Sequence, residues 1–293
     1  MSLEQLGQFV VAGIVAGSIY ALVALGFNVI FNATEIINFA QGEFVMLGGM
    51  FYYAATRDGG LPVLVAVPVA VAGVAVVAAV LEVTVIRPAA QATVLGLVLV
   101  TLAAALLAEA GARSIWGVNP LSVPSFTPGP PFEAGGVTIT RQAVWVVAST
   151  LVVMAALRWF ASRTGTGLAM QATALNREAA QIVGISVRRM VFLSFLLAGL
   201  LGGVGAVLIT PITKVHYELG LSMGIKGFTA AMLGGLGNMP AAVVGGLTLG
   251  LVESIAAGYV PSGLREAIPM SVLVLILLVR PTGILGTGAV DRA

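Results

Sequence analysis

The sequence lacks cysteine and contains a single histidine, His216. Without thiols the chain has no disulfide, no thiolate metal site and no cysteine nucleophile. One imidazole excludes a multi-histidine metal centre, and no Ser/His/Asp set is plausible around it. A Gly-x-x-x-x-Gly-Lys-Ser/Thr phosphate loop is also missing, so the chain does not bind ATP in that way. These absences predict a protein that is not an enzyme and that holds no metal ion.

Charged residues are scarce. They make up 9% of the chain, against 59% hydrophobic residues, and the mean hydropathy is +1.06. A soluble domain has about 25% charged residues, so this chain has too little polar surface to cover a water-soluble body. The 14 basic and 12 acidic residues form no basic stripe with interleaved aromatics. We therefore expect membrane lipid as a partner and no nucleic acid.

Long apolar runs recur along the chain, and most of them reach the ~20 residues that cross a bilayer as a helix. They predict an all-α fold, a polytopic helical membrane protein with eight or nine transmembrane spans. A transmembrane β-barrel would show shorter, alternating segments. The last and third-last runs are marginal in length. The runs lie near residues 6–31, 36–56, 61–86, 91–111, 141–160, 189–211, 220–236, 239–258 and 266–280.

Five of the 14 Lys and Arg residues lie between Arg158 and Arg189. Because basic residues gather in cytoplasmic loops, we predict that the loop at 161–188 is cytoplasmic. Alternation of the spans then places the N-terminus outside, together with a proline-rich loop at 112–140, which is a surface connector or part of a docking surface. The basic residues counted as external are Arg57, Arg113, Arg141, Lys214, Lys226 and Arg265.

The cytoplasmic loop contains the pattern of a short capped helix. Asn176 is a suitable N-cap, residues 177–183 supply about two turns, and Gly184 suits the C′ position. Ala179, Ile182 and Val183 fall at i, i+3 and i+4, so they share one face. This helix is either an ordinary amphipathic loop helix or a docking element for a second protein.

Polar residues also occur within the apolar runs. Amides and carboxylates in lipid are costly and usually face a bundle interior or a cavity. One interpretation is that they line a translocation path. The alternatives are an interfacial turn before a new helix at residues 32–43 and a packing carboxylate at Glu253. The candidate path residues are Asn28, Asn38, Gln41, Glu43 and Glu253.

Three groups of motifs resemble one known family, the LivH-type permease subunits of bacterial ABC importers for branched-chain amino acids. They occur in the expected order and span nearly the whole chain. One departure is Gln41, where the family commonly has histidine. The matching segments are residues 20–26, 36–44 and 46–48, then 167–172, 177–180 and 184–185, and finally 234–240, 245–246 and 250–253.

The resemblance implies that residues 1–293 form one transmembrane permease domain in a bacterial inner membrane. Its implied partners are a second related permease subunit, two cytoplasmic ABC ATPase subunits that bind ATP and Mg, and an external solute-binding protein. The residues that would couple to the ATPase are Arg177, Glu178, Ala179, Ala180 and Gly184. The substrate would be a branched-chain or other hydrophobic amino acid. Alternatives are an ABC permease for urea or short amides, and a self-sufficient carrier or channel.

Overall fold

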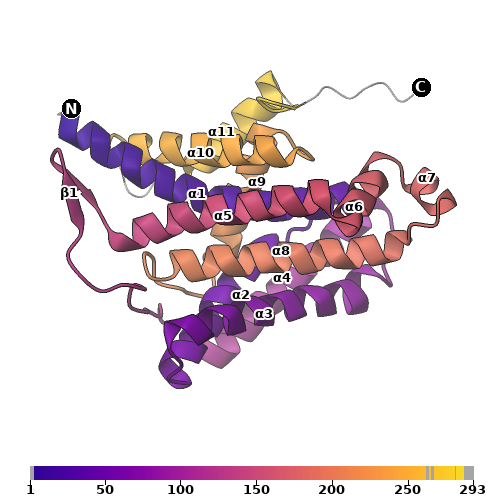
Figure 1. Ribbon diagram of the computed structural model, residues 1–293, viewed down its shortest axis with the longest axis horizontal. Coiled ribbons are helices and arrows are strands. Elements are labelled where there is room, and N and C mark those ends of the chain that lie inside the picture. Colours follow the sequence, from indigo (N-terminus) through magenta and orange to yellow (C-terminus); the bar gives the residue numbers. More distant parts are fainter. Residues whose placement is uncertain (1–2, 262–263, 265–266, 281, 287–293) are drawn as a thin grey trace.

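Figure 1 shows the computed structural model, which describes residues 3–261, 264, 267–280 and 282–286. In this part of the chain, six helices are long and apolar enough to cross a membrane. Three further apolar runs form shorter helices, so the count of eight or nine spans is not confirmed. The six are α1 (Leu3–Thr34), α3 (Val63–Leu81) with its π-helical extension η2 (Glu82–Ile86), α4 (Val94–Trp116), α5 (Arg141–Arg163), α8 (Val187–Ile209) and α10 (Met239–Ala256).

The shorter elements complete an all-helical membrane protein with one small hairpin. They are α2 (Gln41–Tyr53) with its π-helical extension η1 (Ala54–Asp58), α6 (Gly165–Leu175), α7 (Arg177–Ile182), α9 (Leu219–Gly234), α11 (Ala267–Val279), and the antiparallel strands β1 (Phe132–Ala134) and β2 (Val137–Ile139).

Side-chain caps set where several helices begin. A hydroxyl or amide oxygen before the helix accepts a hydrogen bond from a backbone N–H of the first turn, a group that has no partner within the helix. Pro240 follows the cap of α10 and occupies the first turn, as the sequence predicts. The capping residues are Thr93 (α4), Thr140 (α5), Thr164 (α6), Asn176 (α7), Ser186 (α8) and Asn238 (α10).

Two helix triplets, α1–α2–α3 and α8–α9–α10, run in opposite directions. The first helix of each triplet packs on the last helix of the other. Helix α1 packs antiparallel to α10, because Gly13 lies against Leu251 and Gly17 against Leu247. Helix α8 packs antiparallel to α3 in the same way, because Gly199 lies against Ala75 and Gly203 against Val71. In each triplet a short helix lies between two longer ones in the sequence. Two such triplets of opposite direction have the form of the inverted repeats that are common in transporters.

Small residues make the contact between α1 and α10 possible. A Cβ on Gly250 would clash with the backbone of Gly17, so the two backbones touch. Close backbone approach is how helices gain packing energy in lipid, where the hydrophobic effect between helices is absent.

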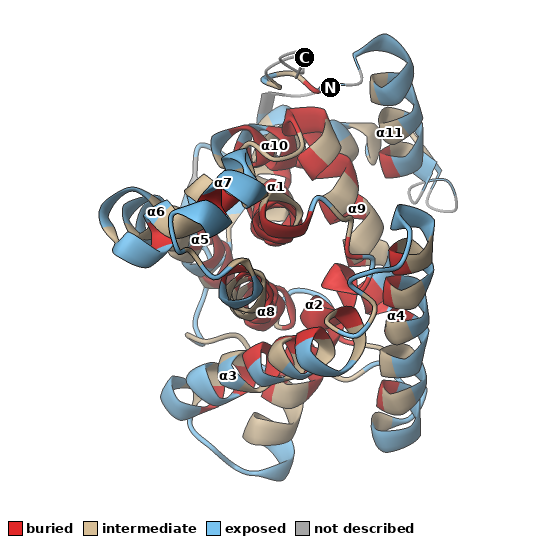
Figure 2. Cartoon of the chain, turned by 90° about the vertical axis from the view of Figure 1, so that its right-hand side faces the viewer, coloured by how far each residue is buried: buried red, intermediate tan, exposed pale blue. Residues whose placement is uncertain are grey.

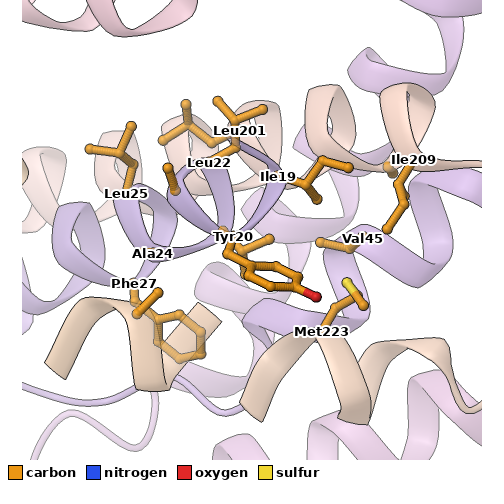
Figure 3. Packing of buried hydrophobic residues seen from close by; sticks show 14 of the residues in the cluster. Ile19, Tyr20, Leu22, Ala24, Leu25, Phe27, Val45, Leu201, Ile209 and Met223 are labelled. Atoms are coloured by element: carbon orange, nitrogen blue, oxygen red, sulfur yellow. The ribbon is translucent and has the colours of Figure 1, made fainter. Parts of the chain in front are cut away.

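The core lies where α1, α2, α8 and α9 meet. Tyr20 from α1 lies beside Val45 from α2 and Met223 from α9, whereas Leu201 from α8 lies beside Leu22 on the opposite side of α1 (Figure 3). Seen along the bundle, buried residues line its centre, while α4 and the outer side of α3 are exposed (Figure 2). Most of the exposed residues on these outer helices are apolar, as a surface that faces lipid requires.

The two ends of the bundle differ. Helix α7 lies at one end, and the hairpin β1–β2 lies at the other, beside the start of α1 (Figure 1). Gln8 fixes the hairpin, since its side-chain amide exchanges two hydrogen bonds with the backbone of Thr138, at 3.1 and 2.9 Å. Helix α4 extends to Trp116, so the connection predicted at 112–140 begins later, at 117. Arg265, which the sequence analysis counted as external, lies outside the described residues.

Candidate functional site: an exposed helix and buried polar residues

Helix α7 is capped at both ends, as its sequence predicts. The Asn176 side-chain oxygen accepts a hydrogen bond from the Ala179 N–H at 2.9 Å. At the other end, Ile185 N–H donates to Ala180 O at 2.9 Å and Gly184 N–H donates to Gln181 O at 3.0 Å. These two bonds are a Schellman motif, which needs a left-handed residue, and Gly184 has φ +85°. The chain therefore fixes this two-turn helix without help from a partner.

The apolar face of α7 is open to solvent. Ile182 is 86% exposed and Val183 is 74% exposed, although both are large hydrophobic residues. Glu178 and Ala179 are also exposed, whereas Ala180 is buried against the protein. A helix that holds bulky apolar side chains outward on a rigid, capped backbone has the form of a docking element rather than of a helix packed on its own chain.

Arg177 differs from Glu178 and Ala179, because its side chain turns inward. Its Nη2 donates a hydrogen bond of 2.9 Å to the carbonyl oxygen of Ala33, in the last turn of α1. Its Nε is buried and has no hydrogen-bond partner among the described residues. The structure thus joins α7 to α1, which is 144 residues away in the sequence.

Three of the predicted path residues gather at the start of α2. The Asn38 side-chain oxygen accepts from Ala40 N–H at 3.1 Å, and the Gln41 amide nitrogen donates to Ala198 O of α8 at 3.3 Å. Both residues and Glu43 are almost completely buried. Each keeps one side-chain atom without a hydrogen-bond partner in the described structure: Asn38 Nδ2, Gln41 Oε1 and Glu43 Oε2. Such unsatisfied buried atoms are uncommon, and they mark a place where a function is plausible on physical grounds.

The two short helices meet at glycines. A Cβ on Gly42 would approach the carbonyl oxygen of Gly220 and would lie 2.7 Å from the Cα of Gly224, so α2 and α9 cross with their backbones in contact. Gly42 and Gly220 are each the second residue of their helix. The Glu43 carboxylate lies directly against Gly220. The start of one triplet's short helix therefore packs on the start of the other's.

Asn28 has a different place from the other path candidates. Its amide nitrogen donates to Asn238 O at 3.0 Å, and its amide oxygen accepts from Gly237 N–H at 3.1 Å. It thereby binds one carbonyl group and one N–H group of the turn that joins α9 to α10. Nothing in the sequence around Asn28 reveals this contact, because the turn lies 209 residues further along the chain.

We expect Asn28→Leu to lower the free energy of unfolding by about 2 kcal/mol, because two partly buried backbone groups lose their hydrogen-bond partner. Thermal unfolding of the purified protein in detergent measures the change. Ser18→Ala in the same helix is the control. Its hydroxyl donates only to Ile14 O within α1, so its loss should cost about 0.5 kcal/mol or less. Equal stability of the Asn28 variant and the wild type would show that the two hydrogen bonds of Asn28 do not stabilise the turn between α9 and α10.

Glu253 lies in an ion pair that sequence reasoning missed. Lys226 Nζ and Glu253 Oε1 are 2.7 Å apart, and the two side chains are 9% and 16% exposed. The Lys226 ammonium also lies 5.6 Å from the centre of the Tyr20 ring. The prediction that Lys226 is an external basic residue is wrong, because Lys226 is buried in the middle of α9. The pair joins α9 to α10.

The sequence profile of the family described as branched-chain amino acid transport system / permease component matches residues 9–279. The chain belongs to this family. It is 31% identical to the high-affinity branched-chain amino acid transport system permease protein BraD of Pseudomonas aeruginosa, over 97% of both chains. It is 29% identical to LivH of Escherichia coli K12, over 96% of this chain and 95% of that protein. A probable LivH of Methanocaldococcus jannaschii is 24% identical, over 97% and 94%.

Membership in this permease family establishes the general class of the protein. Its relatives are permeases of transport systems, not enzymes. ABC permeases work with ABC partner subunits, so the family also implies that this chain acts as one part of an assembly. The caps at both ends of α7 hold its exposed apolar face in a fixed position. A chain that contacts a partner subunit through α7 would need both features.

Proposed function

We propose that this chain is the membrane-spanning subunit of an ATP-driven importer for branched-chain amino acids in a bacterial inner membrane. Its partners would be a second, related permease subunit, two cytoplasmic ABC ATPase subunits and an external binding protein. The ATPase subunits would bind ATP and Mg. The relatives over nearly the whole chain are branched-chain amino acid permeases, which supports this substrate class over urea or short amides.

The observation that carries the proposal is the exposed apolar tip of α7. The permease chain of an ATP-driven importer that has no phosphate loop must receive its energy from another subunit, and α7 supplies a rigid surface for that contact. Ile182 and Val183 would fill a groove on the ATPase, with Glu178 at the rim of the contact. In water these side chains gain nothing by exposure, whereas their burial in a partner is worth about 1.5–3 kcal/mol each.

Movement of the docked ATPase would then reach the spans that flank α7. Helices α6 and α7 lie between α5 and α8 in the chain. Helix α8 packs on α3 and carries Ala198, the backbone partner of Gln41. A shift of α8 would therefore act on the buried start of α2. The crossing of α2 and α9 would be the place where such a shift alters the spans.

The test of the substrate is uptake competition in proteoliposomes that contain the complete complex with ATP inside. We expect leucine, isoleucine and valine each to reduce uptake of labelled leucine by at least about tenfold at saturation, because they would occupy the same binding protein. Urea, acetamide and lysine at equal concentration serve as controls and should leave it unchanged. Competition by urea or acetamide without competition by valine would contradict the proposed substrate.

A further inference from the structure

Arg177 is placed to connect the docking helix with the first span. It is the first residue of α7, next to exposed Glu178, yet its guanidinium contacts the end of α1 rather than the exposed tip. Part of its guanidinium is therefore engaged within the chain rather than at the apolar face of α7. Contact with the partner therefore does not explain why this charged side chain is held inward at the start of α7.

The end of α1 accepts this contact for a physical reason. The last carbonyl groups of a helix have no partner within it, and the negative end of the helix dipole attracts a cation. Helix α1 has no basic residue of its own in its last turn. Arg177 supplies the missing cation from α7, through its bond to Ala33 O. An arginine suits this site because its guanidinium is always charged and presents several donors in a fixed geometry.

The end of α1 leads directly to the buried polar residues of α2. Residues 35–40 connect the two helices, and the Asn38 side chain and the Phe39 N–H fix this connection. Phe39 N–H donates to Thr101 Oγ1 of α4 at 3.3 Å. A displacement of the Ala33 carbonyl would therefore move a short, tethered segment rather than a loose loop. The next residues are the start of α2 and its crossing with α9.

We propose that Arg177 is a positioning residue that transmits movement of α7 to the end of α1 and, through residues 35–40, to α2. The inference rests on the proposed coupling of α7 to an ATPase. It adds a second route into the spans, beside the covalent one through α5 and α8. The buried Nε, which has no partner among the described residues, leaves one donor free for another acceptor when α7 moves.

The test is the number of substrate molecules imported per ATP hydrolysed by the reconstituted complex. We expect Arg177→Met to co-purify with the ATPase but to import about tenfold less substrate per ATP hydrolysed, the size of effect expected from one charged hydrogen bond. Arg177→Lys should recover part of the loss, since it keeps the charge. Arg188→Met is the matched control, because Arg188 is exposed at the start of α8.

Three results would overturn the inference. The first is an unchanged import ratio in Arg177→Met, and the second is an equal loss in Arg188→Met. The third is loss of ATPase binding in Arg177→Met alone, which would show that Arg177 contacts the partner directly. Failure of the unmodified chain to bind any ABC ATPase would instead contradict the proposed function, and the inference with it.

A spectroscopic measurement separates transmission from a purely structural role. The chain has no cysteine, so a single spin label at Phe39→Cys, a partly exposed position, reports on residues 35–40 alone. With the complete complex, addition of ATP should change the mobility of this label. The change should disappear when Arg177→Met is added. A label that responds equally in both backgrounds would contradict transmission through Arg177.

Discussion

Lys226→Met should lower the free energy of unfolding by about 3–5 kcal/mol, the largest effect on stability that we expect from any single charge in this chain. The substitution leaves the Glu253 carboxylate without its cation. Glu253 Oε2 already lacks a hydrogen-bond partner among the described residues, so the carboxylate has no other contact to replace the one it loses. Thermal and denaturant unfolding in detergent, followed by circular dichroism, measure the change.

The double variant Lys226→Met/Glu253→Leu distinguishes a lost pair from lost packing. Replacement of a whole buried pair by apolar residues is often neutral, so the double variant should recover most of the loss. Lys214→Met is the control for the substitution itself, because Lys214 is exposed in the connection before α9, and its effect should stay within about 0.5 kcal/mol. If Lys226→Met were as stable as Lys214→Met, the ion pair would not stabilise the packing of α9 on α10.

Ile182→Asp should abolish ATP-dependent uptake while the protein alone unfolds at the normal temperature. Ile182 is 86% exposed, so the free chain loses no buried contact and its stability should change by no more than about 0.5 kcal/mol. In the assembly, however, the carboxylate would be buried without a cation, which is among the most costly substitutions in an interface. Co-purification of the ATPase and uptake in proteoliposomes measure the two parts of this prediction.

Gln181→Asp is the matched control for Ile182→Asp. It introduces the same charge on the same helix, at an exposed polar position beside the apolar face. Uptake by the Gln181 variant should remain close to that of the wild type. Normal uptake by the Ile182 variant, with the ATPase bound, would contradict the assignment of α7 as the docking element.

Local signals explain why parts of the fold were predictable. Asn176 and Gly184 act through backbone groups within a few residues, so their sequence spacing was enough to predict α7 and its two caps. The same is true of Pro240 at the start of α10. Long apolar runs gave the membrane class directly, because length and composition alone decide whether a helix can cross lipid.

Contacts between distant segments explain what the sequence did not reveal. The Lys226–Glu253 pair joins two helices, and a rule that counts basic residues in loops has no means of placing a lysine inside a glycine-rich run. Asn28 was predicted as a path residue on polarity alone, whereas its partners, Gly237 and Asn238, bind it in space. The path assignments of Asn28, Asn38, Gln41, Glu43 and Glu253 remain predictions.

The inverted arrangement of the two triplets was also beyond the sequence. Gly42 and Gly220 occupy equivalent positions in α2 and α9, but the residues around them differ, so no repeat stands out in the sequence. Opposite direction and exchange of partners appear only when the helices are packed.

The dependence of uptake on partner subunits tests the central claim most directly. Proteoliposomes are prepared with the permease chains alone and with the permease chains plus ABC ATPase subunits, each with the binding protein and labelled leucine outside and ATP inside. We predict uptake only when the ATPase subunits are present, and its loss when ATP is replaced by a non-hydrolysable analogue. Equal uptake by the permease chains without ATPase subunits would contradict the account, because the chain would then be a self-sufficient carrier or channel.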